Sequence, residues 1–517
     1  MIALFGNAIK NRRKKSVQCL CVVVVSLLVG CNGSSTSPRG PASTASPGGG
    51  DNNPATTRIE GPVDGVAFNA WPWSLDEYDY EELEFFITGS ALPYGAEGES
   101  QDYKTRFMVY RPKNPADFNG IAIVEWSNVT AQFDIPLDLV WSHPYVFKKG
   151  YMYVTVSAQE AGICGDSTNT GQCSATSLKS WNAERYGSLE HPGDDYSFDM
   201  FSQIIQSLRQ NNGNTSLDAY ADVSKVIAAG QSQSGMRMNQ YLCNGADADA
   251  RVVDAVFSDA DTGVEITCRP RVPTIQMWTE DSAIPVEVTS KPNHEIWMVA
   301  GAPHEDKWQA VFQSEFTAKN NFGAEPSVSA EEIRESAGNW GQEGPVAGAG
   351  SAACLPEGNA YPRRYVVDAA FHALTVWMTT GLKAPTAPPL LFNNDTAPVE
   401  GSVPAGVTPP VFQTDQHGNA LGGLRLPVMD VPVATYLGST CFLFGQSFPF
   451  SLATNSTLYN SEDDYIEKFN ESVNSAVSNG FLLREDAEDM MRRACAFPVV
   501  GGELTSCPEV NAASYYD

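Results

Sequence analysis

The chain has 517 residues, 42% of them hydrophobic and 18% charged, and its formal net charge is −28. This composition is that of a globular protein with a large core, and it excludes a disordered or fibrous chain. An acidic surface of this size repels nucleic acid and anionic lipid, so we expect no nucleic-acid partner.

The N-terminus is typical of an export signal. Five basic residues precede an apolar stretch, residues 20–29, that is too short to span a bilayer. The stretch ends in LVGC, which resembles the bacterial lipobox, a signal in which the cysteine is lipidated. The resemblance implies a lipoprotein signal over residues 1–31 and a membrane anchor at Cys31. Because Asn32 follows rather than Asp, it also implies an outer-membrane location, facing the periplasm or the cell surface. A plain signal peptide with a chance cysteine is the alternative.

Residues 32–57 are rich in Ser, Pro and Gly and hold almost no large apolar side chains. Such a segment cannot bury surface, so we expect a flexible tether. The folded part then begins near Arg58.

Short apolar runs alternate with amphipathic stretches along the folded part. The expected strands, in chain order, are residues 106–112, 120–127, 151–159, 225–230, 252–260, 272–279 and 295–301. Residues 197–210 and 366–382 carry apolar side chains at helical spacing. Continuous apolar strands that alternate with helices predict an α/β fold, with a mostly parallel central sheet and helices on both faces.

Two connections are longer than a sheet requires, residues 158–196 and 305–360, and we expect them to be lid-like insertions that shape substrate choice. Surface padding is the alternative. We place the main domain at residues 58–395. Residues 396–517 are expected to form a C-terminal extension packed on it, with a last helical stretch near 462–494.

Eight cysteines remain once the signal and Cys31 are set aside, an even number that is typical of disulfides in an exported chain. Cys164–Cys173 and Cys495–Cys507 are close enough in sequence to form local loops. The other four allow three pairings, which the sequence does not distinguish: Cys243, Cys268, Cys354 and Cys441. No CxxC, EF-hand or phosphate-loop spacing occurs, so we expect no metal and no cofactor.

A candidate nucleophile follows the strand at 225–230. The sequence Gly-Gln-Ser-Gln-Ser is a variant of the G-x-S-x-G turn, with Ser234 in place of the last glycine. Small residues on both sides of Ser232 let strand and helix cross closely, and the turn exposes the Ser232 hydroxyl at the carboxyl end of the strand. The backbone N–H of Gln233 then faces a developing oxyanion. An ordinary strand-to-helix loop is the alternative.

An acid and a histidine follow in the order that an α/β-hydrolase requires. The strand at 272–279 ends in Glu280-Asp281, and the strand at 295–301 is followed by His304. We expect His304 to take the proton of Ser232 and return it to the leaving group. Only one of the two adjacent acids can face His304. The alternative for His304 is a solvated loop residue.

Several stretches match one known group. They are EELEFFITGSALPY (81–94), VEWSNVT (124–130), GYMYVTVSAQ (150–159), HPGDDYSFDMFSQ (191–203), GQSQSG (230–235), TED (279–281), AGAPHED (300–306) and GNALGGLRLP (418–427). On these stretches the chain resembles the bacterial alpha/beta hydrolase domain-containing family. The resemblance implies an α/β-hydrolase fold and hydrolase chemistry, and it extends over most of residues 75–430.

The resemblance also bears on the site residues. The family's Thr-Glu-x-Asp pattern maps its Glu onto Glu280 and its Asp onto Ser282, which favours Glu280 as the acid and leaves Asp281 as the fallback. The stretch EWSNVT follows the strand whose outgoing loop usually supplies the second oxyanion N–H. Asn128 and Val129 are therefore the candidates for this donor.

The residues and the resemblance together predict an exported, lipid-anchored serine hydrolase of small-molecule or polymeric carboxylic esters. The predicted triad is Ser232, His304 and Glu280. A peptidase or lactonase on the same triad is one alternative, and a catalytically silent binding lipoprotein is another. The acyl preference and the oligomeric state are not indicated.

Overall fold

A computed structural model describes most of the chain after the tether: residues 57–165, 173–210, 213–220, 222–261, 263, 265–285, 291–322, 340, 358–393, 412–441 and 443–517. The predicted signal with Cys31 and nearly all of the tether lie outside these residues. So do Cys354, much of the second insertion and the first part of the C-terminal extension.

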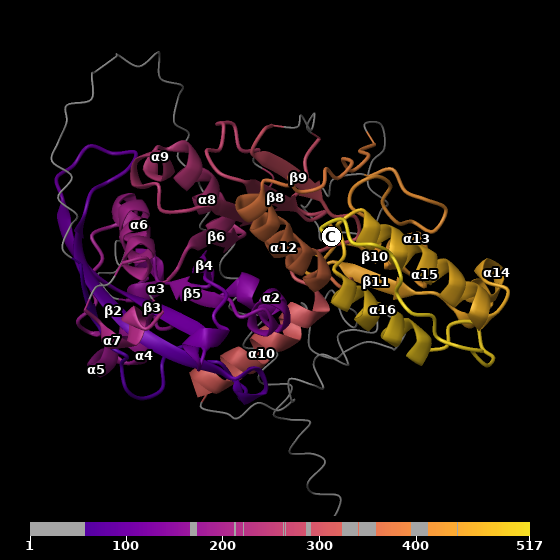
Figure 1. Ribbon diagram of the computed structural model, residues 1–517, viewed down its shortest axis with the longest axis horizontal. Coiled ribbons are helices and arrows are strands. Elements are labelled where there is room, and N and C mark those ends of the chain that lie inside the picture. The colour runs from indigo at the N-terminus through magenta and orange to yellow at the C-terminus, as the bar shows by residue number, and fades with distance from the viewer. Residues whose placement is uncertain are drawn as a thin grey trace, which may run out of the picture.

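A nine-stranded sheet in the order β1-β2-β3-β5-β4-β6-β7-β8-β9 forms the centre of the molecule (Figure 1). The strands are β1 (Arg58–Glu60), β2 (Tyr80–Ala91), β3 (Gln101–Pro112), β4 (Ile121–Trp126), β5 (Met152–Val156), β6 (Lys225–Gln231), β7 (Ala255–Asp259), β8 (Thr274–Trp278) and β9 (His294–Met298). The pairs from β5 to β9 are parallel, while β1, β2 and β3 add antiparallel strands at one edge. The predicted α/β fold with a mostly parallel sheet is confirmed.

Helices cover both faces of this sheet. Side chains alternate between the faces of a strand, so Ile227 and Phe257 join one core cluster while Val226 and Val256 join the other. The helices α2 (Leu137–Lys148) and α12 (Arg364–Thr380) pack on the first face, and α6 (Ser197–Leu208) and α8 (Gln233–Cys243) pack on the second. Shorter or peripheral helices are α3 (Glu160–Ile163), α4 (Leu178–Trp181), α5 (Ala183–Tyr186), α7 (Thr215–Asp218), α9 (Ala246–Ala250) and α10 (Lys307–Phe322).

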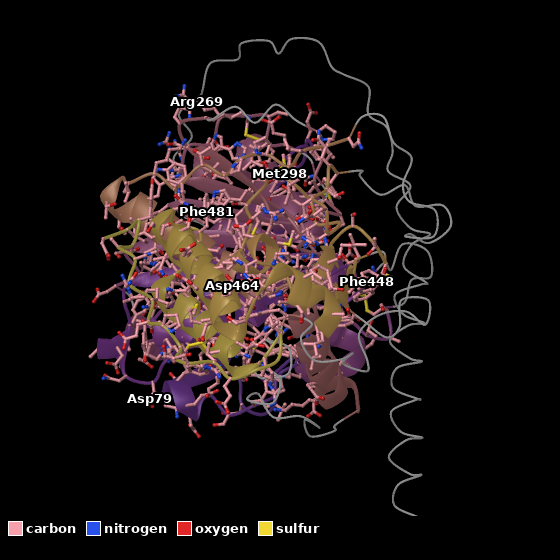
Figure 2. The ribbon with its side chains drawn as sticks, turned by 90° about the vertical axis from the view of Figure 1, so that its right-hand side faces the viewer. Asp79, Arg269, Met298, Phe448, Asp464 and Phe481 are labelled. Carbon is pink, nitrogen blue, oxygen red and sulfur yellow. A yellow bond between two sulfur atoms is a disulfide. The ribbon has the colours of Figure 1, made fainter. Side chains whose placement is uncertain are left out.

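The described part of the C-terminal extension packs against the β9 side of the sheet. It contains α13 (Pro427–Asp430), β10 (Ala434–Leu437), β11 (Gln446–Pro449), α14 (Leu452–Leu458), α15 (Glu462–Ser478) and α16 (Arg484–Ala496). These helices face the viewer in Figure 2, with Asp464 and Phe481 labelled among them. The rings of Phe481 and Trp297 of β9 lie 5.4 Å apart. One core cluster holds residues of both parts, so no separate core divides them among the described residues.

Among the elements that differ from the sequence-based expectation, three have a clear physical reason. The helical stretch near 462–494 is two helices, because the chain turns at Gly480 with a φ of +79°, a conformation that glycine adopts without strain. Strand β2 was not predicted, since it mixes polar and apolar residues irregularly. Helix α2 was not predicted either, and it contains Pro144, a residue that normally argues against a helix interior.

Three disulfides have both of their cysteines among the described residues. Both predicted local pairs are present, Cys164–Cys173 and Cys495–Cys507. The structure adds Cys243–Cys268, which joins the end of α8 to the loop after β7. Cys441 is disulfide-bonded as well.

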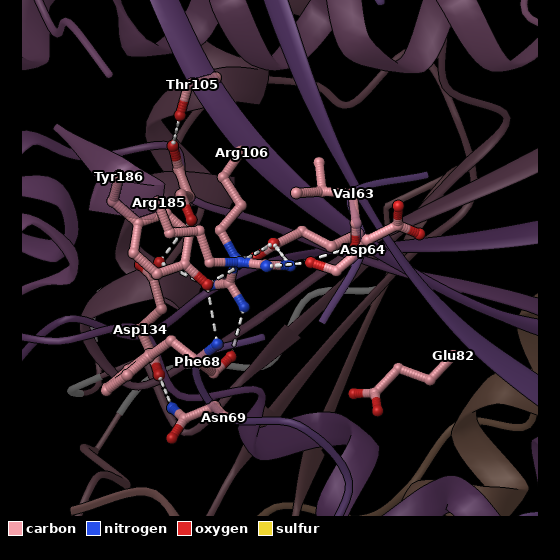
Figure 3. A network of polar contacts seen from close by, with 12 residues as sticks. Val63, Asp64, Phe68, Asn69, Glu82, Thr105, Arg106, Asp134, Arg185 and Tyr186 are labelled. Atoms are coloured by element: carbon pink, nitrogen blue, oxygen red, sulfur yellow. Dashed lines mark hydrogen bonds and ion pairs between the residues drawn. The ribbon is translucent and has the colours of Figure 1, made fainter. Parts of the chain in front are cut away.

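A buried ion network holds the N-terminal strands against the loop that follows β4 (Figure 3). The Glu84 carboxylate pairs with Arg106 and Arg185, each at 2.5 Å, and accepts a 2.8 Å hydrogen bond from the Tyr186 hydroxyl. Arg106 also lies 3.5 Å from Asp134 in the loop after β4. Because each buried charge has a partner of opposite sign, loss of any one member would leave an unpaired buried charge, so the network ties this loop to the strands.

Burial raises the pKa of several carboxyl groups, those of Glu125 and Glu280 to about 7 and that of Asp486 to about 8. The folded protein therefore keeps protons that the unfolded chain, with carboxyl pKa values of about 4, releases. The stability that these groups contribute is complete below about pH 4 and is lost as the pH rises through 7 to 8. We expect a Tm a few degrees lower at about pH 8.5 than at about pH 5.5 in scanning calorimetry.

Glu125→Gln isolates one of these groups. The Glu125 carboxylate accepts hydrogen bonds from the Tyr153 hydroxyl at 2.7 Å and the Asp138 N–H at 3.0 Å, and an amide can bond both neighbours without titrating. The variant should show a shallower loss of Tm with pH, while Glu467→Gln at an exposed position of α15 should not. Equal slopes in wild type and Glu125→Gln would contradict the assignment.

No helix among the described residues is both long enough and apolar enough to cross a membrane.

Candidate active site

Ser232 sits on a strained turn between β6 and α8. Its backbone has φ +62° and ψ −123°, a region that non-glycine residues rarely enter and that costs about 1–3 kcal/mol. The crossing around it is tight: a Cβ on Gly230 would lie 2.6 Å from the Ser234 carbonyl oxygen, and one on Gly235 would lie 2.8 Å from that of Asp259. The Ser232 N–H donates to the Asp259 carbonyl at 2.7 Å. The strand, turn and helix that the sequence predicted around Ser232 are therefore present.

His304 follows β9 and is paired with a carboxylate. Its Nδ1 lies 3.1 Å from Asp281 Oδ2, and the Asp281 Oδ1 accepts a 2.7 Å hydrogen bond from the Thr279 hydroxyl. Asp281 thus holds the imidazole with a proton on Nδ1, which leaves Nε2 free to accept one. The residue is 3% exposed, so the alternative of a solvated loop histidine is wrong.

The acid that pairs with His304 is not Glu280, the one that the sequence favoured. Glu280 Oε1 accepts the Gly301 N–H and Oε2 accepts the Gly438 N–H, each at 2.6 Å. Adjacent residues in a turn point in different directions, and these two backbone donors hold Glu280 away from the imidazole. The assignment of Glu280 as the partner of His304 is corrected to Asp281, the fallback. Glu280 instead joins the histidine loop to the C-terminal extension.

Two backbone donors remain for an oxyanion. The Asn128 N–H donates to the Ile135 carbonyl at 2.9 Å, so Asn128 is not free to serve. No described residue accepts the N–H of Val129 or that of Gln233, the first residue of α8. The Asn128 side chain donates to the Gln231 carbonyl at 3.0 Å, which ties this loop to the turn of Ser232.

The first insertion contacts the same turn. The Gln159 side-chain oxygen accepts 2.9 Å hydrogen bonds from the side chains of Gln233 and Trp126. Its amide donates to Asp194 at 2.8 Å, and Asp194 pairs with Arg237 of α8 at 2.6 Å. The described part of residues 158–196 is therefore attached to the start of α8 beside Ser232, as expected for a segment that borders a site.

These residues follow the same end of the sheet because the strands are parallel. The carboxyl ends of β4, β6, β8 and β9 lie at one edge of the sheet, and they are followed by Val129, Ser232, Asp281 and His304. Ligand sites in open α/β sheets form at this edge. Among the described residues, no group of His, Cys, Asp and Glu has a metal-binding arrangement.

Sequence reasoning missed one buried residue at this site. Arg363 precedes α12, is 0% exposed, and bonds both the His304 carbonyl and the Asp259 carboxylate. The sequence YPRRY contains two adjacent arginines, and nothing in it distinguishes the one that reaches the site.

The chain matches a family model and several solved structures. A family model described as alpha/beta hydrolase domain matches residues 47–492. Among solved structures, a putative dienelactone hydrolase from Klebsiella pneumoniae is 14% identical, covering 39% of this chain and 75% of its own, with a TM-score of 0.23. XC6422 from Xanthomonas campestris, an a/b serine hydrolase without lid, is 11% identical, covering 41% and 83%, with a TM-score of 0.25.

A CE15 glucuronoyl esterase from Teredinibacter turnerae is 13% identical, with a TM-score of 0.21. The match covers 40% of this chain and 46% of that protein. At these TM-scores the structural matches carry no information about the substrate of this chain. No curated protein matches it.

Proposed function

Since the chain belongs to the alpha/beta hydrolase domain family, we propose that it is a serine hydrolase that cleaves carboxylic ester bonds through an acyl-enzyme. Ser232 is the nucleophile, His304 is the general base and then the general acid, and Asp281 orients His304. The backbone N–H groups of Gln233 and Val129 form the oxyanion hole.

The proposed reaction gives each of these groups one role. Ser232 Oγ attacks the ester carbonyl carbon while His304 Nε2 takes its proton, and the carbonyl oxygen becomes an oxyanion that the two N–H groups stabilise. His304 then returns the proton to the departing alcohol, which leaves Ser232 acylated. Water, deprotonated by His304, attacks the acyl group and releases the acid and the free serine.

One observation carries the proposal: the 3.1 Å pair of His304 Nδ1 with Asp281 Oδ2. It lies at the end of the sheet where the strained Ser232 precedes α8. A silent scaffold has no need of a backbone held at φ +62° or of a carboxylate fixing one histidine tautomer. The helix start adds its positive dipole end next to the site where the oxyanion forms.

A fluorophosphonate probe tests the serine chemistry directly. The purified protein should lose its esterase activity on reaction, and peptide mass spectrometry should place the single adduct on Ser232. A panel of p-nitrophenyl esters, lactones and amides then separates an esterase from a lactonase or peptidase. A protein that neither reacts with the probe nor turns over any member of the panel would be a silent binder.

We also propose that the protein is exported and anchored to the outer membrane through Cys31. The lipobox supports this location, and so do the disulfides, which persist in oxidising compartments. Cys31→Ser should abolish incorporation of an alkyne fatty acid and release the protein from the membrane fraction, because it removes the acylated thiol. Cys21→Ser, within the apolar stretch of the signal, should leave both unchanged. Labelling that persists in Cys31→Ser would contradict the anchor.

A further inference from the structure

Arg363 contacts two separate parts of the site. Its side chain is fully buried, so its charge needs partners that replace water. One guanidinium nitrogen pairs with the Asp259 carboxylate and another donates to the main-chain carbonyl of His304. The guanidinium also lies over the Trp141 ring, 4.1 Å from its centroid. Arg363 therefore contacts His304, in the loop after β9, and Asp259, the last residue of β7.

Asp259 in turn contacts the nucleophile. Its carbonyl accepts the Ser232 N–H at 2.7 Å, while its carboxylate binds Arg363. The chain of contacts thus runs from the Ser232 backbone through Asp259 and Arg363 to the His304 backbone. Asp281 contacts only the ring of His304. It therefore does not set the distance between the His304 backbone and the turn that carries Ser232.

We propose that Arg363 is a positioning residue that holds His304 at a fixed separation from Ser232 by binding the His304 carbonyl and Asp259 together. This inference rests on the proposed function and adds a residue to it. Proton transfer between the serine and the imidazole depends on their separation, and a misplacement of about 1 Å can lower the rate about 100-fold. A lysine at this position has one ammonium and cannot reproduce the planar, forked contact.

A second buried carboxyl, that of Asp138 in α2, lies close to Asp259. Burial, followed by the nearby charges of Asp259 and Glu125, raises the pKa of Asp138 well above its usual value. Burial raises the pKa of Asp259 as well, and the neighbouring Arg363 guanidinium opposes that rise. Arg363 therefore favours the anionic form of Asp259 in a place where three carboxyl groups lie close together.

The neighbouring Arg364 provides a matched control. It is also buried, at 7% exposure, lies 4.6 Å from the centroid of the Trp308 ring, and pairs with Asp489 of α16 at 2.8 Å. It therefore resembles Arg363 in burial, charge and stacking. Its carboxylate partner belongs to the C-terminal extension, and it has no contact with Ser232, His304 or Asp259 among the described residues.

The test compares Arg363→Lys with Arg364→Lys, with p-nitrophenyl acetate as substrate and fluorophosphonate titration of active sites to correct for unfolded enzyme. We expect Arg363→Lys to lower kcat per active site about 100-fold with KM changed less than about threefold. Arg364→Lys should lower Tm to a similar extent and keep kcat within about threefold of wild type. Equal kcat per active site in Arg363→Lys and wild type would overturn the inference.

A double variant covers the case in which Arg363→Lys does not fold. Asp259→Asn with Arg363→Met removes both buried charges, a change that proteins often tolerate, and it keeps the Asp259 main-chain bond to Ser232. If calorimetry shows that this double variant is folded, its kcat should still be lowered. A wild-type kcat in the folded double variant would overturn the inference. If the wild type itself fails to react with the probe, the proposed function fails and the inference with it. A reactive wild type with unaffected variants overturns the inference alone.

Discussion

Ser232→Ala should lower kcat for p-nitrophenyl acetate by a factor on the order of 10⁶, because no other group can form the acyl-enzyme. The remaining rate would come from the oxyanion donors and from substrate binding alone. Alanine and serine are both non-glycine residues, so both adopt the positive φ at this position at a similar cost. We therefore expect the fold to persist with a small change in Tm. The measurements are kcat by stopped assay, the fluorophosphonate adduct by mass spectrometry, and Tm by calorimetry.

Ser234→Ala is the matched control for this variant. Ser234 lies two residues further on and is fully buried, and its hydroxyl has no hydrogen-bond partner among the described residues. Removing an unsatisfied buried hydroxyl should leave kcat unchanged and Tm equal or higher. Wild-type turnover by Ser232→Ala would show that the serine assignment is wrong, whatever Ser234→Ala does.

Asp281→Asn should lower kcat by a factor of about 10⁴ while leaving the backbone in place. The amide would present an N–H to His304 Nδ1, so the proton would move to Nε2 and the imidazole could no longer accept the serine proton. The 2.7 Å bond from the Thr279 hydroxyl can still be accepted by the amide oxygen. The loss should therefore appear in kcat and in the rate of fluorophosphonate labelling rather than in Tm.

Glu280→Gln, at the adjacent residue, should show the opposite pattern. Its amide group would face one of the two glycine N–H donors that the carboxylate now accepts, which leaves a buried donor unpaired. We expect a loss of about 1–3 kcal/mol in the free energy of unfolding. The effect on kcat should be far smaller than that of Asp281→Asn. Should Glu280→Gln lose about 10⁴ in kcat while Asp281→Asn stays active, Glu280 would be the orienting acid after all.

The elements around the site were predictable because their signals are local. Strands β6 to β9 are short segments rich in apolar residues. Helix α6 carries five apolar side chains at helical spacing. Each pattern identifies its element without knowledge of its neighbours. The turn at Ser232 was predictable for the same reason. Small residues beside a serine, between a strand and a helix, are required by the close crossing that Gly230 and Gly235 now show.

The orienting acid was not predictable from the residues alone. Glu280 and Asp281 have the same chemistry and adjacent positions, so the sequence offered no physical ground to choose between them. The decision depends on the N–H groups of Gly301 and Gly438, and Gly438 lies 158 residues further along the chain in the C-terminal extension. The same holds for the oxyanion donor, where a bridge to Ile135 removes Asn128 and leaves Val129.

What the sequence by itself determined is the α/β architecture, the order of serine, acid and histidine, and the local disulfides Cys164–Cys173 and Cys495–Cys507. Periodicity and short spacings are properties of neighbouring residues, and they survive without a fold. Only the tertiary structure decided which carboxylate faces His304, and it alone placed Arg363 between His304 and Asp259. Those outcomes depend on which backbone groups and charges become neighbours when strands distant along the chain align at one edge of the sheet.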